Sequence, residues 1–219
     1  MSILTYPLGF LGGGGDDFYN GVIENSLRFD ALDPYLKRTP SNDSSGKVWT
    51  LSLWFKRSKA AVSGYLFQAT DGTNAANDTG KISILIHSSD DQLRIGTQST
   101  VIRKTSQVFR DTSWYHLVIT FNTPSSAATE RTKVWINGQQ VTSFAASANI
   151  GQNVITSVNQ DQSIHYIGAE DATYTNWDGY MTDYYLIDGY ALGPENFGEY
   201  KNGVWIPKDY AGPPPLITD

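Results

Sequence analysis

The sequence predicts an all-β protein built as one sandwich of two antiparallel sheets. Apolar and polar residues alternate in many short stretches beyond residue 26, which is the period of a half-buried strand. No stretch keeps the 3.6-residue apolar period of a helix over several turns. Charged residues make up only 17% of the chain, and residues that suit strands and turns replace them.

The strands are expected in the following order along the chain. In "VWTLSLWFKR" the apolar face consists of Trp49, Leu51, Leu53 and Phe55. The stretches "KISILIH", "QLRIG", "WYHLVITFN" and "TKVWING" follow with the same alternation. Asn137-Gly138 then predicts a type I′ hairpin, because that turn needs positive φ at both central residues. Strands with one apolar face each bury it by packing two sheets together.

The last long strand is expected at "YMTDYYLID". Strict alternation places these residues on one face: Tyr180, Thr182, Tyr184 and Leu186. The residues expected on the opposite face of the strand are Met181, Asp183, Tyr185 and Ile187. A five-residue spacing puts successive aspartates of the set Asp178, Asp183 and Asp188 on opposite faces, so the three are not expected to form one site.

Three segments are expected. Residues 1–25 form a Gly-rich arm, residues 26–205 form the sandwich, and residues 206–219 form a Pro-rich extended tail. A short helix is predicted at "GPENFGEY", which has Pro194 at its start and acidic residues in its first turn.

The arm carries three apolar residues, Leu8, Phe10 and Leu11, in a stretch that glycine makes costly to order. Two interpretations remain open: the arm lies on its own domain, or it inserts into an assembly as an anchor. We favour the anchor, because these side chains favour burial over exposure to water.

Bulk composition excludes several classes of protein. There are no cysteines, so disulfides and thiolate metal sites are excluded. The net charge is −6 with no long basic run, which argues against a nucleic-acid partner. The N-terminal stretch does not read as a secretory signal, and no apolar run approaches the length of a membrane-spanning helix. We therefore expect synthesis in a cytoplasm and no membrane insertion.

Six stretches, in order, resemble the concanavalin A-like sandwich of the laminin G type: "SLRFDALDPYL", "WTLSLWFKRS", "GYLFQA", "SWYHLVITFN", "TKVWINGQQV" and "YIGAEDATYTNWDGYMTDYYLIDGYALGPENF". They cover most of residues 26–198. The resemblance implies a jelly-roll sandwich of two antiparallel sheets. Members of this family mostly bind glycans or proteins or serve as structural parts, and some relatives are glycosidases.

Two stretches, "RFDALDPYLKRTP…WTLSLWFKRS" and "YKNGVWIPKDYAG", also resemble versions of the domain that occur in virion proteins of marine bacteriophages. This resemblance implies a structural virion protein, a capsid decoration or a fibre subunit, made in the host cytoplasm. Its partners would be other virion proteins and further copies of itself, with trimers common among such parts. The alternative is an adhesin that binds host-surface glycan.

Catalysis is not expected. Glycosidases need two carboxylates beside one bond, and the E-x-D-x-x-E strand of the glucanase relatives is absent. The acidic pairs "DD" at 90–91 and "ED" at 170–171 lie in predicted loops. There is no G-x-S-x-G elbow, no H-E-x-x-H motif and no phosphate-binding glycine loop. No cofactor is predicted apart from calcium.

Calcium is implied by the resemblance alone. Relatives often hold calcium near the first and last strands, and the corresponding carboxylates here are Asp30, Asp33 and Asp178. This chain has Ala31 where the family usually has glycine. The other interpretation is that these aspartates bond backbone amides at turns.

A glycan site is predicted at two loops. Aromatic rings would stack on the sugar, and amide side chains would bond its hydroxyls. The candidates are Asn74, Asn77, Tyr174, Asn176 and Trp177. The other interpretation is that Trp177 and the neighbouring tyrosines cover the sandwich or contact another subunit.

Overall fold

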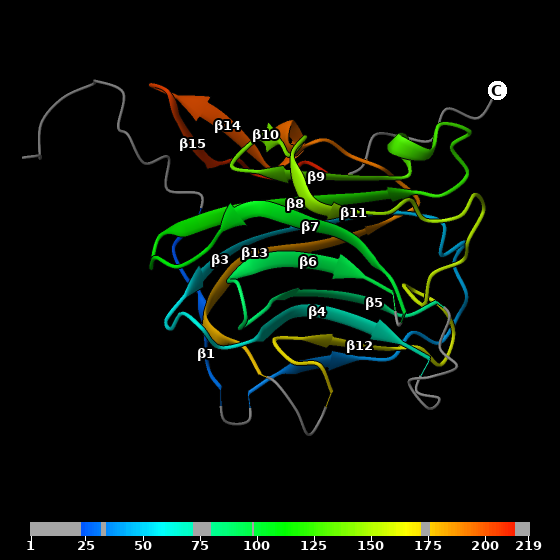
Figure 1. Ribbon diagram of the computed structural model, residues 1–219, viewed down its shortest axis with the longest axis horizontal. Helices are drawn as coiled ribbons and strands as arrows, with labels where there is room; N and C mark the ends of the chain where they lie inside the picture. Colours follow the sequence, from blue (N-terminus) through cyan, green and yellow to red (C-terminus); the bar gives the residue numbers. More distant parts are fainter. Residues whose placement is uncertain (1–22, 32–33, 72–79, 98, 172–175, 213–219) are drawn as a thin grey trace, which may run out of the picture.

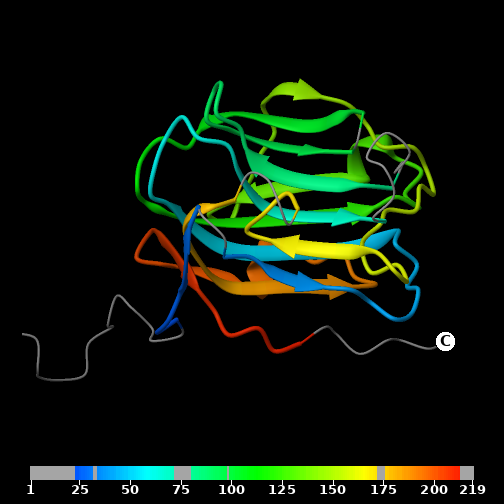
Figure 2. The same ribbon diagram turned by 90° about the horizontal axis from the view of Figure 1, so that it is seen from below.

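A computed structural model describes residues 23–31, 34–71, 80–97, 99–171 and 176–212. The fold is the predicted one, a sandwich of two antiparallel sheets with a small additional hairpin (Figures 1 and 2). No helix in these five ranges is long and apolar enough to cross a membrane.

One sheet has six strands, and all its neighbouring pairs are antiparallel. Its strands, in spatial order, are β1 (Leu27–Asp30), β13 (Asp178–Asp188), β3 (Val48–Arg57), β8 (Trp114–Asn122), β9 (Thr132–Ile136) and β10 (Gln139–Gln140). The predicted type I′ turn between β9 and β10 is confirmed, with φ of 49° at Asn137 and 77° at Gly138.

The second sheet has seven strands, also antiparallel throughout. Its strands, in spatial order, are β11 (Phe144–Ser147), β7 (Val101–Val108), β6 (Gln92–Gly96), β5 (Ile82–Ile86), β4 (Gly64–Thr70), β12 (Ile164–Ile167) and β2 (Leu36–Arg38).

The C-terminal part forms a hairpin of β14 (Gly198–Lys201) and β15 (Val204–Pro207), beside β10 in Figure 1. The helix predicted at residues 193–200 is wrong in extent. Only a 3-10 turn, η2 (Pro194–Asn196), forms before β14 begins, and a second such turn, η1 (Ala128–Glu130), precedes β9.

The core lies between the two sheets. β3 contributes the predicted face, and Trp49, Leu51, Leu53 and Phe55 are all fully buried. The rings of Trp49 and Phe121 stack with their centroids 4.3 Å apart. Each such side chain contributes about 1.5–3 kcal/mol by leaving water, so the sandwich needs no covalent cross-link.

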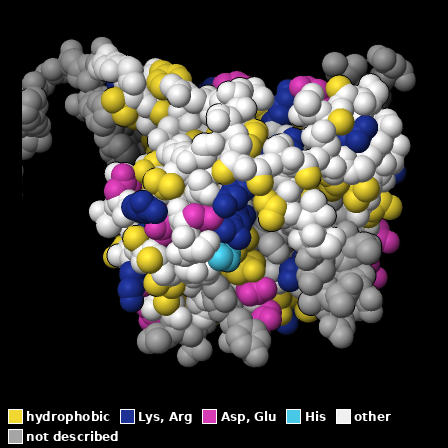
Figure 3. All heavy atoms as spheres, viewed as in Figure 1, with side chains coloured by type: hydrophobic (Ala, Val, Ile, Leu, Met, Phe, Trp, Pro, Cys, Tyr) yellow, Lys and Arg dark blue, Asp and Glu magenta, His cyan; other side chains and the backbone are white. Residues whose placement is uncertain are grey.

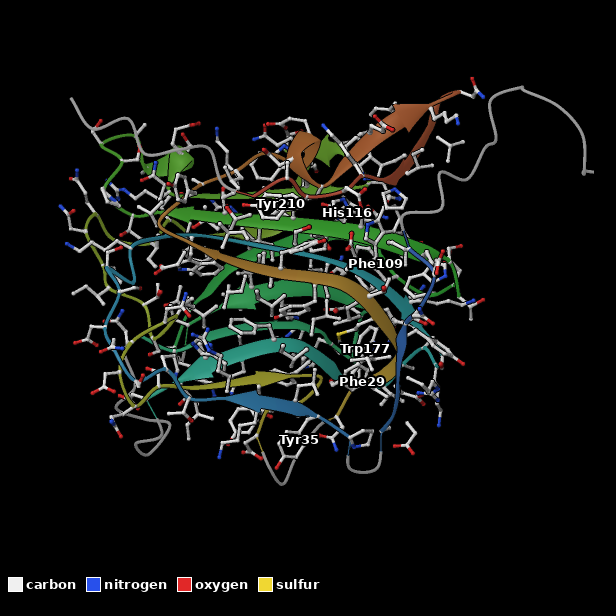
Figure 4. All side chains as sticks on the ribbon, turned by 180° about the vertical axis from the view of Figure 1, so that it is seen from behind. Phe29, Tyr35, Phe109, His116, Trp177 and Tyr210 are labelled. Atoms are coloured by element: carbon white, nitrogen blue, oxygen red, sulfur yellow. The ribbon has the colours of Figure 1, made fainter. Side chains whose placement is uncertain are left out.

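The other face of β3 is buried as well, which alternation did not predict. Thr50, Ser52 and Trp54 are covered from outside the sandwich. A second apolar cluster lies on this side and consists of Val118, Leu192 and Phe197 with Trp135, Tyr185, Ile187, Tyr190 and Tyr210. The Tyr210 ring lies 4.9 Å from Phe197, so packing against the sheet continues beyond residue 205. In Figure 4, Tyr210 lies on the opposite side of β13 from Trp177.

The faces predicted for the last long strand are wrong in its second half. A β-bulge between Thr182 and Tyr185 sets two residues of β13 opposite Leu53 alone, and Asp183 has a φ of 51°. Tyr184 and Leu186 therefore join Met181 on the core side. Tyr185 and Ile187 face the second cluster. One extra residue has exchanged the faces of everything after it.

Candidate functional site

The predicted glycan loops do not provide an exposed tryptophan. Trp177 is only 1% exposed, and its ring packs edge-on against Phe55 at 5.8 Å. It is therefore a core residue and does not present a stacking surface for a sugar. Asn176, beside it, is half-buried.

Six of the residues predicted for the sites lie outside the described parts of the chain: Leu8, Phe10, Leu11, Asn74, Asn77 and Tyr174. Their roles stay predictions.

Two of the three predicted calcium ligands lie opposite one another. Asp30 of β1 pairs in register with Asp178 of β13, so both side chains project from the same face of the sheet. Arg28 donates a hydrogen bond from Nη2 to Asp178 Oδ1 at 2.8 Å. Asp33 falls in a range that the structure does not describe.

The turn after β1 keeps a glycine-like conformation although Ala31 occupies it. Ala31 has a φ of 67°, a value that residues with a side chain rarely adopt. Its N–H donates to the Trp177 carbonyl at 3.2 Å. A positive φ at this position is therefore kept without glycine, but no group of three metal-ligating side chains is found in the part of the chain described here.

A buried Ser–His pair lies under the C-terminal hairpin. His116 Nε2 is 2.9 Å from Ser52 Oγ, and Trp205 Nε1 is 2.9 Å from His116 Nδ1. Because an indole nitrogen only donates, Nδ1 accepts and the proton sits on Nε2. His116 then donates to Ser52 and cannot remove its proton.

Burial lowers the pKa of His116 to about 3. The ring stays neutral, stacks on Trp54 with centroids 4.9 Å apart, and lies nearly parallel to Trp205, which bonds its edge. This constellation is structural.

The candidate site is a groove of about 350 Å³ on the outer face of the seven-stranded sheet. Its principal lining residues are Tyr65, Lys81, Ser83, His87, Arg94 and Glu170. Alternation explains their orientation: Ile82, Ile84 and Ile86 of β5 face the core, so the residues between and after them face outward. Figure 3 shows acidic and basic side chains gathered around a histidine on this face.

One side of the groove is organised by Glu170. Lys81 Nζ lies 3.9 Å from its carboxylate. Burial, together with the charge and hydrogen bond of Glu170, raises the pKa of Tyr65 above its usual range. Gln68 donates to the Glu170 backbone carbonyl and accepts a hydrogen bond from Ser83 at 3.1 Å. The acidic and hydroxyl groups here are held in place by neighbouring strands.

The other side of the groove is organised by Asp90. Its carboxylate forms ion pairs with Arg94 Nη2 and Lys104 Nζ, at 2.7 Å each. Burial would raise the pKa of Asp90, but the hydrogen bonds from Lys104 and Arg94 outweigh it and hold the pKa well below the usual range. His87 Nδ1 accepts from the Ser89 backbone N–H at 3.2 Å. Burial, followed by the charge of Arg94, lowers the pKa of His87.

The groove thus presents ordered donors and acceptors, the chemistry that suits a polyhydroxylated ligand. Sequence reasoning did not assign this site. The alternation in "KISILIH" and "QLRIG" already directs Ser83, His87 and Arg94 outward, and that signal was available. Nothing in the sequence shows that Glu170, far along the chain, lies against Tyr65.

Comparison with solved structures supports the fold. A pentraxin from Limulus polyphemus matches at 18% identity, with 76% of each chain covered and a TM-score of 0.53. Domain 4 of an arabinanase from Geobacillus stearothermophilus, solved in complex with arabinotriose, matches at 18% identity, with 84% of this chain and 79% of that chain covered and a TM-score of 0.53.

The sialidase of Trypanosoma rangeli matches at 16% identity and a TM-score of 0.55, with 79% of this chain covered. This chain spans only about a quarter of that enzyme's length, 26%. No curated protein sequence matches.

Residues 30–196 match the family described as the concanavalin A-like lectin/glucanases superfamily, of the laminin G type. That match covers most of the chain and runs from the last residue of β1 to the end of η2. The protein therefore belongs to the concanavalin A-like lectin/glucanase superfamily.

Proposed function

We propose that this protein is a non-enzymatic bacteriophage virion protein, a capsid decoration or fibre subunit, whose sandwich binds carbohydrate on the host surface. The observation that carries the binding role is the groove on the outer face of the seven-stranded sheet, with its ordered hydroxyl, imidazole, guanidinium and carboxylate groups. The arabinanase domain solved with arabinotriose supports carbohydrate as the ligand class.

Binding is favoured over hydrolysis by the side chains of the groove. Hydrolysis of a glycosidic bond uses a pair of carboxyl groups about 5–10 Å apart across that bond. Among the described residues that line the groove, Glu170 is the single carboxylate. Its carboxylate is held by a hydrogen bond from Tyr65 and by Lys81 at 3.9 Å.

The virion role is supported by the sequence resemblance and by what its stretches form. "YKNGVWIPKDYAG" contains the end of β14, all of β15 and Tyr210, which packs against the six-stranded sheet. The N-terminal arm, residues 1–25, would anchor each subunit through Leu8, Phe10 and Leu11. The subunit would associate with other copies, as a trimer, and with other virion proteins.

Calcium remains part of the proposal through Asp30, Asp33 and Asp178. A bound cation would have to displace Arg28 from Asp178. We expect Arg28→Gln to strengthen calcium binding by about tenfold, since one competing positive charge is removed. Isothermal titration of both proteins with calcium measures this.

A glycan array probed with the full chain, with and without calcium, tests the binding role. We expect Tyr65→Phe to weaken glycan binding by about tenfold. It removes the hydroxyl that is hydrogen-bonded to Glu170 and leaves the ring in place. Tyr180→Phe, on the other sheet, is the matched control. If no glycan on the array is bound with or without calcium, the binding role is refuted. If Tyr65→Phe and Tyr180→Phe weaken binding equally, the glycan does not bind in this groove.

Mass spectrometry of purified virions tests the structural role. The protein should be present in stoichiometric amounts in intact particles. Its absence from particles, with abundant free protein in the lysate, would refute it.

A further inference from the structure

An apolar groove lies on the outer side of the six-stranded sheet. The groove lined by Tyr65 and Glu170 lies on the outer face of the other sheet. The apolar hollow has a volume of about 380 Å³, and a more polar hollow of about 470 Å³ beside it shares four of its lining residues: Trp54, Trp114, Val204 and Trp205. Ile206 and Pro207 of β15 extend its wall.

The floor of this groove is rigid and its rim is exposed. Trp54 stacks on His116 with centroids 4.9 Å apart, and Trp205 donates a hydrogen bond to the same ring at 2.9 Å. At the rim, Trp114 is 37% exposed and Val204 is 44% exposed. An apolar hollow with an exposed aromatic rim is typical of a docking surface.

The described chain begins in the wall of the same groove. Ile23, Glu24, Asn25 and Ser26 line it, so the 22 residues that precede them in the sequence are covalently attached at this wall. Glu24 is the one formally charged side chain among the described residues that line the two hollows. An occupant without charged side chains fits such walls.

The N-terminal segment has that chemistry. Residues 1–15 contain no charged side chain and carry the apolar set Leu8, Phe10 and Leu11. Eleven residues, 12–22, separate Leu11 from Ile23, and a chain of that length reaches up to about 36 Å. It includes Gly12–Gly15, which can adopt the positive φ of a chain reversal.

We propose that Leu8, Phe10 and Leu11 dock in this groove of their own chain. A short tether holds a segment at an effective concentration of the order of millimolar, so docking within one chain outcompetes docking between dilute subunits. The free subunit thereby covers both its apolar segment and its apolar groove, and assembly proceeds by releasing the segment. This inference does not depend on carbohydrate binding.

The test uses the full chain and a fluorescent peptide of residues 1–15. The variant carries Leu8→Ser, Phe10→Ser and Leu11→Ser, which leaves the groove unaltered. We expect the variant to bind the peptide at least about tenfold more tightly than the unsubstituted protein, measured by fluorescence polarisation, because its groove is vacated. Adding Val204→Asp should abolish this binding, whereas adding Ile155→Asp, at an exposed site outside the groove, should not.

Three results would overturn the proposal. Equal binding by the unsubstituted protein and the variant would show that the segment does not occupy the groove. Absence of binding to the variant would show that the groove does not recognise it. An unsubstituted protein that is oligomeric by light scattering, with a monomeric variant, would place the segment in a neighbouring chain.

Discussion

Trp177 shows how its neighbours in space decide the role of an aromatic residue. As a loop residue beside Asn176 it fits a sugar site, yet its indole closes one end of the sandwich core against Phe55. Gly64 makes room for it, because a Cβ there would lie 2.7 Å from the ring. Sequence neighbours cannot reveal this, since Gly64 and Phe55 are distant in the chain.

Replacement of Trp177 by alanine should therefore affect stability and not recognition. We expect a loss of about 3–5 kcal/mol in the free energy of unfolding, the cost of emptying a large buried site. Trp114→Ala, at a site that is 37% exposed, should cost much less and serves as the control. Urea denaturation measures both, and a loss below about 1 kcal/mol for Trp177→Ala would contradict the burial.

At the scale of the element, the bulge in β13 determines which side chains enter which cluster. Without it, Tyr184 and Leu186 would leave the core and Tyr185 would enter it. The strand has the same composition in either register, so alternation alone could not find the extra residue. The signal is Asp183, whose side chain tolerates a positive φ and accepts a hydrogen bond from the Tyr185 hydroxyl at 2.8 Å.

Deletion of Asp183 should remove the bulge and exchange the faces of residues 184–188. We expect loss of more than about 4 kcal/mol of stability or failure to fold, because several apolar side chains would face the wrong side together. Asp183→Gly keeps the chain length and suits the φ of 51°, so it should fold. Circular dichroism and thermal unfolding compare the two, and a deletion variant as stable as the glycine variant would contradict this account.

The C-terminal hairpin covers one end of the outer face of β3, and Leu192, Phe197 and Tyr210 cover the rest. Trp205 covers His116 and donates to it, and Gly138 and Gly198 lie so close to the indole that a Cβ at either would clash with it. We expect Trp205→Phe to cost about 1–3 kcal/mol, because it leaves the buried Nδ1 of His116 without a donor.

A double-mutant cycle with Ser52→Ala checks the coupling through His116. The two substitutions should be non-additive, since both act on one hydrogen-bonded ring. Additive losses would show that the hairpin acts by burial alone.

At the scale of the whole molecule, local sequence patterns predicted the strands and turns, which depend on neighbouring residues. The sandwich, its strands and the type I′ turn at Asn137-Gly138 follow from alternation and turn chemistry. The second cluster under the C-terminal segment and the groove joining Tyr65 to Glu170 depend on contacts between residues far apart in the chain. Such contacts leave no periodic signal, which is why the fold was predictable and the candidate site was not.

The stability of the whole molecule should fall in mild acid. Burial lowers the pKa of His116 to about 3 and that of His165 to about 4, whereas a histidine in the unfolded chain titrates near 6.5. Between these values the unfolded chain binds more protons, so the stabilisation is complete above about pH 6.5 and is lost as the pH falls below it. The carboxyl groups of Asp90 and Asp91, whose pKa values are lowered, lose their stabilising effect only as the pH falls toward the unfolded value of about 3.9.

At about pH 5 each of the two histidines should remove about 2 kcal/mol of unfolding free energy relative to pH 7. Urea denaturation at both pH values measures the loss for the unsubstituted protein and for His116→Gln, which keeps a neutral donor and acceptor at that position. The variant should lose about 2 kcal/mol less stability on acidification than the unsubstituted protein, because one buried ring no longer titrates. Equal losses in the two proteins would show that His116 is protonated in the folded state, and with that the hydrogen bonds from Trp205 and to Ser52 would need to be reassigned.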